Sequence, residues 1–428
     1  MIRLPKKVGD LMRLLEERGV KAYVTGEAAA LSMLNKNSSD WDMIAIDRRK
    51  SGENIGIILG TILKKASIAE IGNHKIRVDF TEGEGDKESP VIDIDFYTEQ
   101  EGEGSLLEKI LKDQVFTYKS MAFDAERNLT DPYGGNKNME SKLIACMGDP
   151  RKRFESEPIL MMEAVRFAAE NDFDIQKNLY EIIVEMSSHL ENADKRFIRE
   201  NLEAVVTAPN AGKGLKMLAG SNLMPAIIGH EAAKLNKRQR NRFSVLCDNI
   251  DKTQPVRERR LGLLYSCFED KKGMKAIEHL DYDEKTKQHL ADGLKLTDRM
   301  HFIRYPHELK DFLVEVGQER YEYMDNLSKA ERIVFDGSGI KILSRYHMLK
   351  LIKEAGEPIW VEDLAIDVSY LVHKLEMSRE EAEKMLIMLT DVVHRKPGEN
   401  TPDKLLKYAM KFKKNKFAAS TRRIKWLR

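Results

Sequence analysis

The alternation of hydrophobic and polar positions in the first third of the chain predicts a mixed α/β unit. Apolar residues between positions 8 and 15 recur at helical spacing and predict an amphipathic lead-in helix. Short apolar runs that end at turn residues are typical of strands. Four such runs are present, near residues 21–24, 41–46, 74–80 and 91–97. Between them, the stretches 27–34 and 54–66 have a helical pattern, so we expect helices packed against a sheet.

Helical periodicity dominates from about residue 138 onward, and convincing strands disappear. The stretches 157–171 and 196–208 place apolar side chains three and four residues apart, which is typical of amphipathic helices. Gly, Pro and charged residues interrupt this pattern near 148–153, 251–255, 335–340 and 394–402. The sequence therefore predicts an α+β protein, in which an α/β domain is followed by several all-α sub-bundles.

Length and composition bound the organisation of the protein. A chain of 428 residues is too long for one ordinary core, so about two to four domains are expected. The 71 Lys and Arg nearly cancel the 70 Asp and Glu, so attraction to a polyanion must come from local clusters. The sequence shows no signal peptide and no apolar stretch of about 18 residues. Cys146, Cys247 and Cys267 fit neither a disulfide framework nor a zinc spacing, so we expect a cytoplasmic protein.

Two aspartates carry the clearest chemical signal in the first domain. Asp40 and Asp42 lie two residues apart at the start of a predicted strand, which places both side chains on one face. Two adjacent carboxylates bind Mg²⁺ and leave positions for water and phosphate. Such ions activate an attacking hydroxyl and stabilise a leaving pyrophosphate. An isolated Asp-x-Asp is a weak signal, however, because acidic pairs at strand ends are often only solvated.

Residues on neighbouring elements strengthen the interpretation of a phosphate-handling site. A third acid, Asp93, lies on a later predicted strand with Asp95 as its same-face neighbour, and one of the two is expected to be a solvated edge residue. We prefer Asp93 as the member of the site. Upstream, Thr25 and Gly26 lie between a strand and a helix, where backbone N–H groups can approach phosphate oxygens. A single Gly in this position is also compatible with an ordinary turn.

The segment 116–175 resembles bacterial class II CCA-adding enzymes and their poly(A) polymerase relatives. The run LTDPYGG at 129–135 looks like the family's loop after the catalytic domain, and 153–170 looks like its nucleotide-recognition helix. The segments 205–229 and 357–409 are similar to the neck and body and to the tail. The resemblance therefore covers nearly the whole chain and implies a polymerase β-type nucleotidyltransferase head followed by an all-α neck, body and tail. The implied boundaries are 1–137, 138–250, 251–340 and 341–428.

The resemblance implies an RNA 3′-end nucleotidyltransferase that uses Mg²⁺ and takes its nucleotide from ATP or CTP. The expected RNA is the acceptor arm of tRNA. Asp40 and Asp42 would hold the metal, with Asp93 as third catalytic acid. The nucleotide-binding residues implied are Thr25, Gly26, Lys119, Glu157 and Arg166. In this assignment Lys119 is a substitute cation and Glu157 replaces a base-recognising Asp.

The chain departs from the family pattern where the nucleotide should bind. The family's Gly-Gly turn is Thr25-Gly26, and the Arg-Asp pair that follows is Ala29-Ala30. Its Arg-Arg-Asp is 113–115, read as Asp-Gln-Val, and an Asn is replaced by Lys119. In the recognition helix, two expected Arg positions are Leu160 and Glu163. The hydrogen-bonding template for the base is therefore incomplete, and charge-assisted phosphate contacts are lost.

These departures leave three functions open. The first is an active nucleotidyltransferase, which retention of both aspartates favours. The second is a catalytically degenerate relative that binds RNA or protein. The third is a transferase with a changed nucleotide or acceptor, acting alone, as a homodimer or beside a partner subunit that supplies missing groups.

Two basic clusters are candidates for RNA contact. The segment 404–428 holds ten Lys or Arg and no acid, interleaved with aromatic residues that suit phosphates and unstacked bases. Its candidates are Lys413, Lys414, Arg422 and Arg423. A second cluster contributes Lys237, Arg238 and Arg240. The alternative is an amphipathic helix with a solvated basic face.

Overall fold

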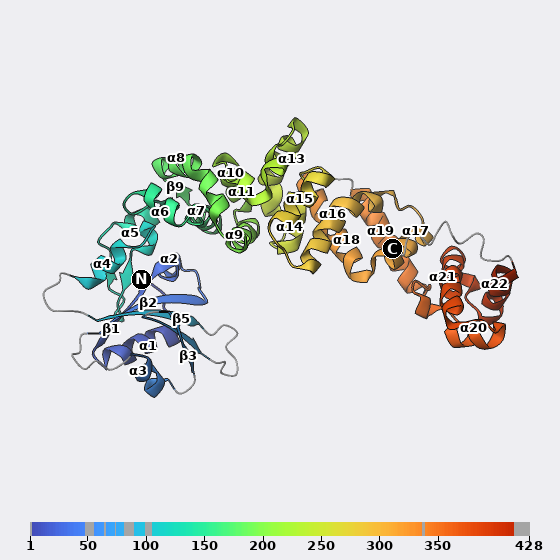
Figure 1. The fold of residues 1–428 in the computed structure, drawn as a ribbon, viewed down its shortest axis with the longest axis horizontal. Coiled ribbons are helices and arrows are strands. Elements are labelled where there is room, and N and C mark those ends of the chain that lie inside the picture. The colour runs from blue at the N-terminus through green and yellow to red at the C-terminus, as the bar shows by residue number, and fades with distance from the viewer. Residues whose placement is uncertain are drawn as a thin grey trace. The chain divides into compact units, whose positions relative to one another are not determined.

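The computed structural model of the chain divides into two compact units. Unit 1 comprises Met1–Phe197 together with Met217–Leu223, and unit 2 comprises Ile198–Lys216 together with Met224–Arg428 (Figure 1). The structure describes residues 2–47, 55–63, 66–72, 74–80, 90–98, 105–335 and 339–414. The acidic, Gly-containing stretches 81–89 and 99–104 of the sequence lie outside these ranges. The finer division into head, neck, body and tail stays a prediction.

Unit 1 is built on a seven-stranded mixed sheet of order β3-β4-β5-β2-β1-β6-β7. Its strands are β1 (Val20–Thr25), β2 (Asp40–Asp47), β3 (Ala66–Gly72), β4 (Lys75–Phe80), β5 (Val91–Thr98), β6 (Ala122–Phe123) and β7 (Leu129–Thr130). The neighbours β2 and β5 run parallel, and the other pairs are antiparallel. The four strands predicted from the sequence are confirmed as β1, β2, β4 and β5.

Helices pack against both faces of this sheet, but they cover the second face only in part. The predicted lead-in helix is confirmed as α1 (Lys6–Glu16), and it shares one hydrophobic core with Met43 of β2, Ile92 of β5 and Leu59 of α3 (Ile55–Ile62). On the opposite face, Leu107 and Leu111 of α4 (Leu106–Lys112) pack with residues of the later half of β2. The first residues of β2 on that face are not part of either apolar cluster, so polar side chains are accommodated there.

The helices α2 (Gly26–Met33) and α7 (Leu160–Asn171) carry the segments predicted to contact the nucleotide. A stack of aromatic rings fixes α7: the Tyr118 ring lies 3.9 Å from that of Phe167 and 5.5 Å from that of Phe116. Tyr118 belongs to the short 3-10 helix η1 (Thr117–Lys119). Since all three rings are fully buried, η1 and α7 form one packed assembly.

The remainder of unit 1 is mostly helical. Its helices are α5 (Gly135–Glu140), α6 (Pro150–Ser156) and α8 (Lys177–Met186), followed by the 3-10 helix η2 (Ser187–Asn192). The strands β8 (Leu143–Ile144) and β9 (Asp174–Ile175) form a small parallel pair that the sequence did not predict. Each contributes two residues, which is too short for a periodic signal.

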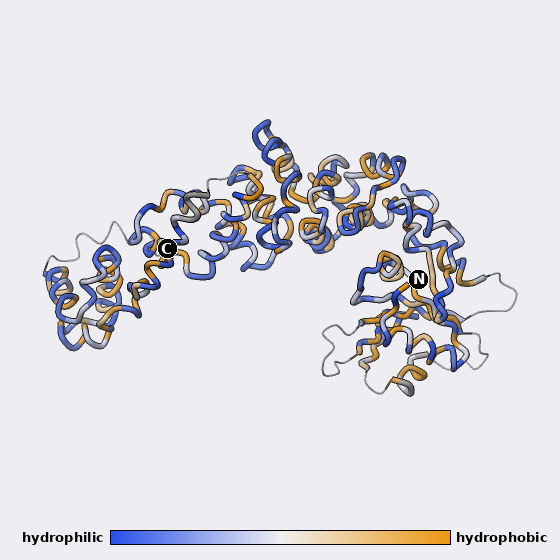
Figure 2. The backbone as a smooth tube through the Cα atoms, turned by 180° about the vertical axis from the view of Figure 1, so that it is seen from behind, coloured by the Kyte–Doolittle hydropathy of each residue, from blue (hydrophilic) through white to orange (hydrophobic). Residues whose placement is uncertain are grey.

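Unit 2 is helical throughout its described residues. Its helices are α9 (Lys195–Thr207), which begins in unit 1, α10 (Ala211–Gly220), which ends in unit 1, α11 (Met224–Ile228), α12 (His230–Ala233), α13 (Lys237–Asn249), α14 (Arg257–Tyr265), α15 (Asp270–His279), α16 (Glu284–Phe302), α17 (Pro306–Val316), α18 (Gln318–Phe335), α19 (Gly339–Glu354), α20 (Val368–Leu375), α21 (Arg379–Arg395) and α22 (Pro402–Lys414). Short 3-10 helices lie at Ile250–Lys252, Val361–Asp363 and Pro397–Glu399. Hydrophobic and hydrophilic residues alternate along these helices, as amphipathic packing requires (Figure 2). None of the helices in the described part of the chain is long and apolar enough to cross a membrane.

The α+β class predicted from the sequence is confirmed by this arrangement. The last three helices, α20 to α22, share a separate hydrophobic core that includes Leu371, Leu389 and Leu405. Lys310 of α17 is fully buried and its Nζ lies 2.6 Å from a carboxylate oxygen of Glu357, just before these helices. The core of α20 to α22 is therefore only one part of the buried interior of the all-α part.

Candidate functional site

The pairing of β2 with β5 brings the predicted carboxylates together. Their parallel register places Asp42 opposite Asp93 and Asp40 opposite Val91. Residues opposite each other in register point to the same face of a sheet. Asp40 is exposed and Asp42 is half-buried. A ladder of acids therefore lies on the face that α4 covers further along β2, at the start of the strand.

Asp42 is held close to the Gly26 turn. In the antiparallel pairing of β1 with β2, Thr25 lies directly opposite Asp42. Gly26 follows with φ of 71°, in the left-handed region that favours glycine, and a Cβ built there would lie 2.5 Å from Asp42 Oδ2. Gly26 thus leaves room for the carboxylate. Burial, together with Asp93 and Asp95, raises the pKa of Asp42 against the lowering effect of Lys75 and Lys119.

Asp93 is engaged by two basic side chains that sequence reasoning missed. Arg77 of β4 donates two hydrogen bonds to it, with distances of 2.7 Å from Nε to Oδ1 and 2.9 Å from Nη2 to Oδ2. Lys75 Nζ lies 3.9 Å from Asp93 and 3.7 Å from Asp95. The signal lay in the run at 74–80, where both cations share a face with the acids once β4 pairs with β5.

The carboxylates of the ladder form an incomplete metal site. Among the residues that the structure describes, no group of three His, Cys, Asp or Glu side chains is placed to hold a metal ion. Arg77 pairs with Asp93, and Lys75 lies 3.7 Å from Asp95, so Asp40 and Asp42 are the carboxylates of the ladder without an ion pair among the described residues. Two carboxylates suit Mg²⁺, which usually keeps several waters and binds through one or two carboxylates plus substrate phosphates. The donor set therefore fits the metal only as a two-ligand site.

Thr25 and Lys119 lie beside the Gly26 turn but are occupied by partners within unit 1. The Thr25 hydroxyl is within hydrogen-bond distance of the backbone oxygens of Met121, at 2.9 Å, and of Lys119, at 3.2 Å. It therefore ties β1 to the segment after η1. Lys119 Nζ donates to Glu163 Oε2 over 3.0 Å. A cation and a carboxylate are therefore paired at positions 119 and 163, where the sequence resemblance implied an Asn and an Arg.

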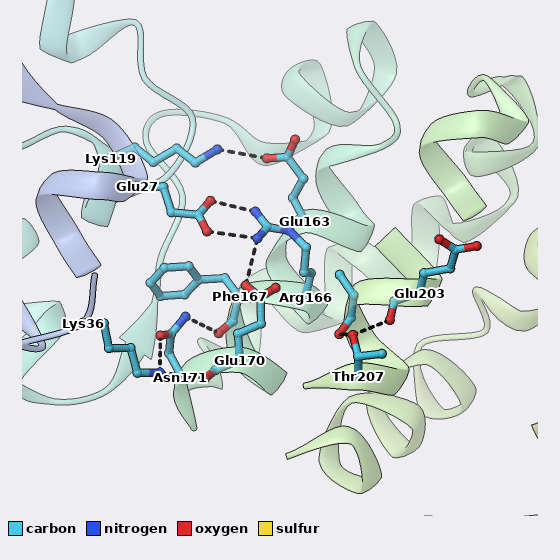
Figure 3. A network of polar contacts seen from close by, with 11 residues as sticks. Glu27, Lys36, Lys119, Glu163, Arg166, Phe167, Glu170, Asn171, Glu203 and Thr207 are labelled. Atoms are coloured by element: carbon cyan, nitrogen blue, oxygen red, sulfur yellow. Dashed lines mark hydrogen bonds and ion pairs between the residues drawn. The ribbon is translucent and has the colours of Figure 1, made fainter. Parts of the chain in front are cut away.

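Arg166 is the centre of a second group of ion pairs (Figure 3). Its Nη1 and Nη2 donate to the two carboxylate oxygens of Glu27 over 2.9 and 2.7 Å, and Nη1 also lies 2.8 Å from Glu170 Oε2. Burial alone would raise the pKa of Glu27, but the hydrogen bond and charge of Arg166 outweigh it and the pKa is lowered. Burial dominates at Glu170, whose pKa is raised. The guanidinium is therefore committed to protein carboxylates.

The predicted base-recognition positions differ in exposure. Glu157 follows the last residue of α6 and is exposed. Leu160 begins α7 and is 4% exposed, so it belongs to the core and not to a hydrogen-bonding surface. Of the predicted nucleotide-binding set, Gly26 is the residue that lies against a carboxylate of the ladder. The assignments of Glu157 and Arg166 as nucleotide contacts stay predictions.

The predicted RNA-contacting residues lie at two places in unit 2. Lys237 and Arg238 are exposed in the first turn of α13, while Arg240 donates to the backbone oxygen of Leu235 over 2.7 Å. Lys413 and Lys414 are exposed in the last turn of α22, where Lys413 donates to the backbone oxygen of Leu375. Arg422 and Arg423 lie outside the described residues. None of these positions is tested as an RNA contact by the fold.

Several curated relatives of this chain are named CCA-adding enzymes. No model of a known protein family matches the chain. The CCA-adding enzyme of Geobacillus sp. (strain WCH70) is 24% identical over 226 residues, covering 51% of this chain and 53% of that protein. The CCA-adding enzyme of Streptococcus suis (strain 05ZYH33) is 24% identical over 362 residues, covering 79% of this chain and 82% of that protein. The matched region spans about half the length of the Geobacillus and Bacillus licheniformis relatives, 53% and 57% respectively.

Solved structures with the same fold cover nearly the whole chain. The Bacillus stearothermophilus CCA-adding enzyme in complex with CTP has a TM-score of 0.74 at 18% identity, and covers 96% of this chain and 98% of that one. The Thermotoga maritima CCA-adding enzyme complexed with tRNA has a TM-score of 0.64 at 17% identity, and covers 95% and 96%. At such identities the likeness establishes the fold.

The mixed sheet of unit 1 and the helices that follow it are the fold of these CCA-adding enzymes. The resemblance to CCA-adding enzymes predicted from the sequence is confirmed by the curated relatives and by the fold. The identities to these relatives and structures are low, between 17% and 24%.

Proposed function

We propose that this chain is an RNA nucleotidyltransferase that extends the 3′ end of tRNA with nucleotides from ATP or CTP. The observation that carries the proposal is the placement of Asp42 against the Gly26 turn and beside Asp93. The relatives named CCA-adding enzymes support it, because the chain has the same fold over nearly its full length.

In the proposed reaction, Asp40 and Asp42 would hold Mg²⁺. The ion would supply charge neutralisation for the phosphates and lower the pKa of the attacking hydroxyl. The backbone at Gly26 and the first turn of α2 would approach phosphate oxygens. Lys119 is a candidate for a side-chain cation, and its ammonium would have to leave Glu163 in order to contact a phosphate.

Nucleotide selection is proposed to differ from that of the named relatives. Leu160 is buried and has no donor to offer a base edge. Glu163 holds Lys119, so a carboxylate and an ammonium stand together beside α7. A base edge that meets paired polar groups is discriminated strongly, whereas an apolar surface discriminates weakly. We therefore expect preferences among the four NTPs that are weaker than, or different from, strict C and A addition.

A second candidate function is a non-catalytic RNA-binding or protein-binding relative. The observation that favours it is charge pairing at the site: Arg77 with Asp93, Lys119 with Glu163 and Arg166 with Glu27. Each pair occupies a group that a metal or nucleotide would otherwise use. The two candidates differ in whether Asp40 and Asp42 matter, because only the first needs them.

Incorporation of labelled nucleotides separates the two functions. The protein is incubated with Mg²⁺, each of ATP, CTP, GTP and UTP, and tRNA ending before CCA, after C or after CC. Incorporation that disappears in the Asp40→Ala Asp42→Ala variant supports the transferase. No incorporation from any NTP, together with unchanged tRNA binding by that variant, would support the non-catalytic function instead. Thermal unfolding of the variant serves as the control for its fold.

A further inference from the structure

The helix α2 is fastened to α7 at both of its ends. In its first turn, Glu27 accepts a hydrogen bond from the Arg166 guanidinium on each of its two carboxylate oxygens. Just beyond its last residue, Lys36 Nζ donates to the Glu170 backbone oxygen and to Asn171 Oδ1, each over 2.7 Å. Both contacts are visible in Figure 3. Glu27, at the start of α2, contacts Arg166, and Lys36, after its end, contacts the last two residues of α7. Each end of α2 therefore has its own attachment to α7.

The attachment at Glu27 is the more specific of the two. A bidentate pair between Arg and a carboxylate fixes orientation as well as distance. The side chains of Arg166 and Glu27 are 20% and 22% exposed, so bulk water competes weakly with the pair. The acid also lies in the first turn of α2, where the helix dipole favours negative charge. The arrangement suits a structural attachment better than a contact that opens for a ligand.

The residue attached in this way adjoins the acid ladder. Glu27 directly follows Gly26, and the Cα of Gly26 lies against Asp42, as the position of a built Cβ shows. Thr25 ties the other side of the turn to the segment after η1 through its hydroxyl. The Gly26 turn is therefore held on one side by Glu27 and on the other by Thr25, and Asp42 packs against this turn. Because closely packed groups move together, a displacement of α2 would shift the Gly26 turn and with it the Asp42 carboxylate.

We propose that Arg166 is a positioning residue, which acts through Glu27 to fix the Gly26 turn and thereby the Asp42 carboxylate. The inference rests on the proposed function in that it takes Asp42 as a metal ligand. It replaces the nucleotide contact predicted for Arg166 with an indirect role. In this arrangement α7 sets the geometry of the proposed metal-binding carboxylate of Asp42. Glu27 and Arg166 act together as one ion pair.

Substitutions at the two partners test whether they act as a unit. The variants are Arg166→Gln, Glu27→Gln and the double substitution, with Arg166→Lys to keep the charge and lose the bidentate geometry. We expect each single variant to weaken Mn²⁺ binding by about 10-fold or more, as loss of a supporting contact at a metal site does. The double variant should be no weaker than the weaker single variant. Mn²⁺ binding is measured on the full chain by electron paramagnetic resonance.

A surface pair of the same chemistry provides the control. Arg151 makes a bidentate pair with Glu185 in unit 1, and both side chains are at least half exposed. Arg151→Gln should leave Mn²⁺ binding unchanged. Thermal unfolding of every variant separates loss of fold from loss of position, and Arg166→Lys is the variant expected to keep the fold if Arg166→Gln does not.

The kinetic pattern distinguishes positioning from direct nucleotide contact. Positioning predicts a lower kcat with little change in KM for the nucleotide, for Arg166 and Glu27 variants alike. A raised KM for Arg166→Gln alone, with Glu27→Gln unaffected, would overturn the inference in favour of a nucleotide contact. Equal Mn²⁺ affinity in the wild type and all variants would also overturn it. Failure of the wild type to incorporate any NTP overturns the proposed function, whereas the Mn²⁺ comparison still decides the role of Arg166.

Discussion

In the proposed function, Asp42 would be subject to opposing demands of stability and metal binding. Its pKa is raised, with burial as the largest cause, so the fold disfavours the ionised form that a metal requires. Below the pKa of the unfolded carboxyl the group is neutral in both states. As pH rises through the raised pKa of the folded state, stability is lost. The ionised carboxylate therefore costs stability at neutral pH.

Replacing Asp42 with Asn should stabilise the fold and abolish metal binding. We expect the Tm of Asp42→Asn to exceed that of the wild type by a few degrees at most near pH 7, and the difference to shrink as the pH falls. Calorimetry over a pH series, without added metal, measures this. Asp40→Asn is the control, because Asp40 is exposed and its substitution should change Tm little. A lower Tm for Asp42→Asn at neutral pH would contradict the argument.

Gly26 is predicted to be required for the position of Asp42. In Gly26→Ala the added Cβ would meet Asp42 Oδ2, and the φ of 71° is strained for alanine. We expect a loss of about 1 kcal/mol or more in unfolding free energy, and Mn²⁺ affinity lowered by at least several-fold. Gly9→Ala in α1 is the matched control, since a Cβ there meets nothing within 4 Å. That variant should be neutral or more stable, because Ala favours helix over Gly.

At the residue scale, the sequence indicated the acids but not their partners. A period of two was sufficient to place Asp40 and Asp42 on one face of β2. The pairing of Asp93 with Arg77 depends on the register of β4 against β5, which no short motif encodes. The pairing of Arg166 with Glu27 joins residues 139 positions apart and depends on how α2 meets α7. Tertiary contacts of this kind appear only when the elements are assembled.

At the scale of elements, the edge strand β3 shows where pattern reasoning was wrong. The helix expected over 54–66 ends at Ile62 in the structure, and Ala66 begins β3. Most residues of β3 are exposed, so it lacks the alternation of apolar and polar positions that a half-buried strand shows. Its pairing with β4, and not its own hydrophobic pattern, makes it a strand. The central strands and α1, which bury apolar residues, were predicted correctly.

Arg77, which lies on β4 beside the edge strand β3, is predicted to weaken metal binding. Arg77→Gln removes the cation that occupies both oxygens of Asp93, so Asp93 becomes available as a third carboxylate beside Asp42. Because a further anionic ligand strengthens binding of a divalent cation, Mn²⁺ affinity should rise several-fold. Arg151→Gln serves again as the control with the same charge change. Unchanged or weaker Mn²⁺ binding by Arg77→Gln would show that Asp93 does not reach the ion.

The first turn of α13 is predicted to contribute to RNA affinity. Lys237 and Arg238 are exposed there. If both contact phosphates, Lys237→Ala Arg238→Ala should weaken tRNA binding and reduce the slope of log affinity against log salt by about 2. The matched control is Lys177→Ala Arg379→Ala, which removes two other exposed cations. Filter binding over a salt series measures both variants, and equal slopes would exclude the first turn of α13 as a contact.

At the scale of the whole molecule, the sequence predicted the succession of an α/β part and an all-α part. It did so because periodicity changes from two to 3.6 along the chain, and periodicity reports burial on one face. It did not indicate that Met217–Leu223 belongs to unit 1 while the residues on either side belong to unit 2. Contacts of Tyr180 with Met217 and of Ser187 with Asn222 produce that crossing. Helical pattern alone does not encode which core a helix joins.

The all-α part is predicted to depend on a buried cation. Lys310 of α17 is 0% exposed, and its ammonium contacts a carboxylate oxygen of Glu357 at 2.6 Å. Removing one member of a buried ion pair leaves the other charge without compensation, whereas replacing both costs little. Glu357→Gln leaves the fully buried Lys310 without a partner, whereas Lys310→Met leaves Glu357, which is 29% exposed, so water offsets part of the loss only in the second variant. Glu357→Gln should therefore cost about 1–3 kcal/mol in unfolding free energy.

Substitution of Lys310 instead of Glu357 tests whether the two members of the pair contribute unequally to stability. Lys310→Met removes the charge and keeps most of the volume, so it should change stability by less than about 1 kcal/mol. The double variant Lys310→Met Glu357→Gln should recover most of the loss caused by Glu357→Gln alone. Urea unfolding followed by circular dichroism gives the three values for a double-mutant cycle. Additive effects of the two substitutions would mean that the pair is not coupled, and that α17 is held to the segment before α20 by apolar packing instead.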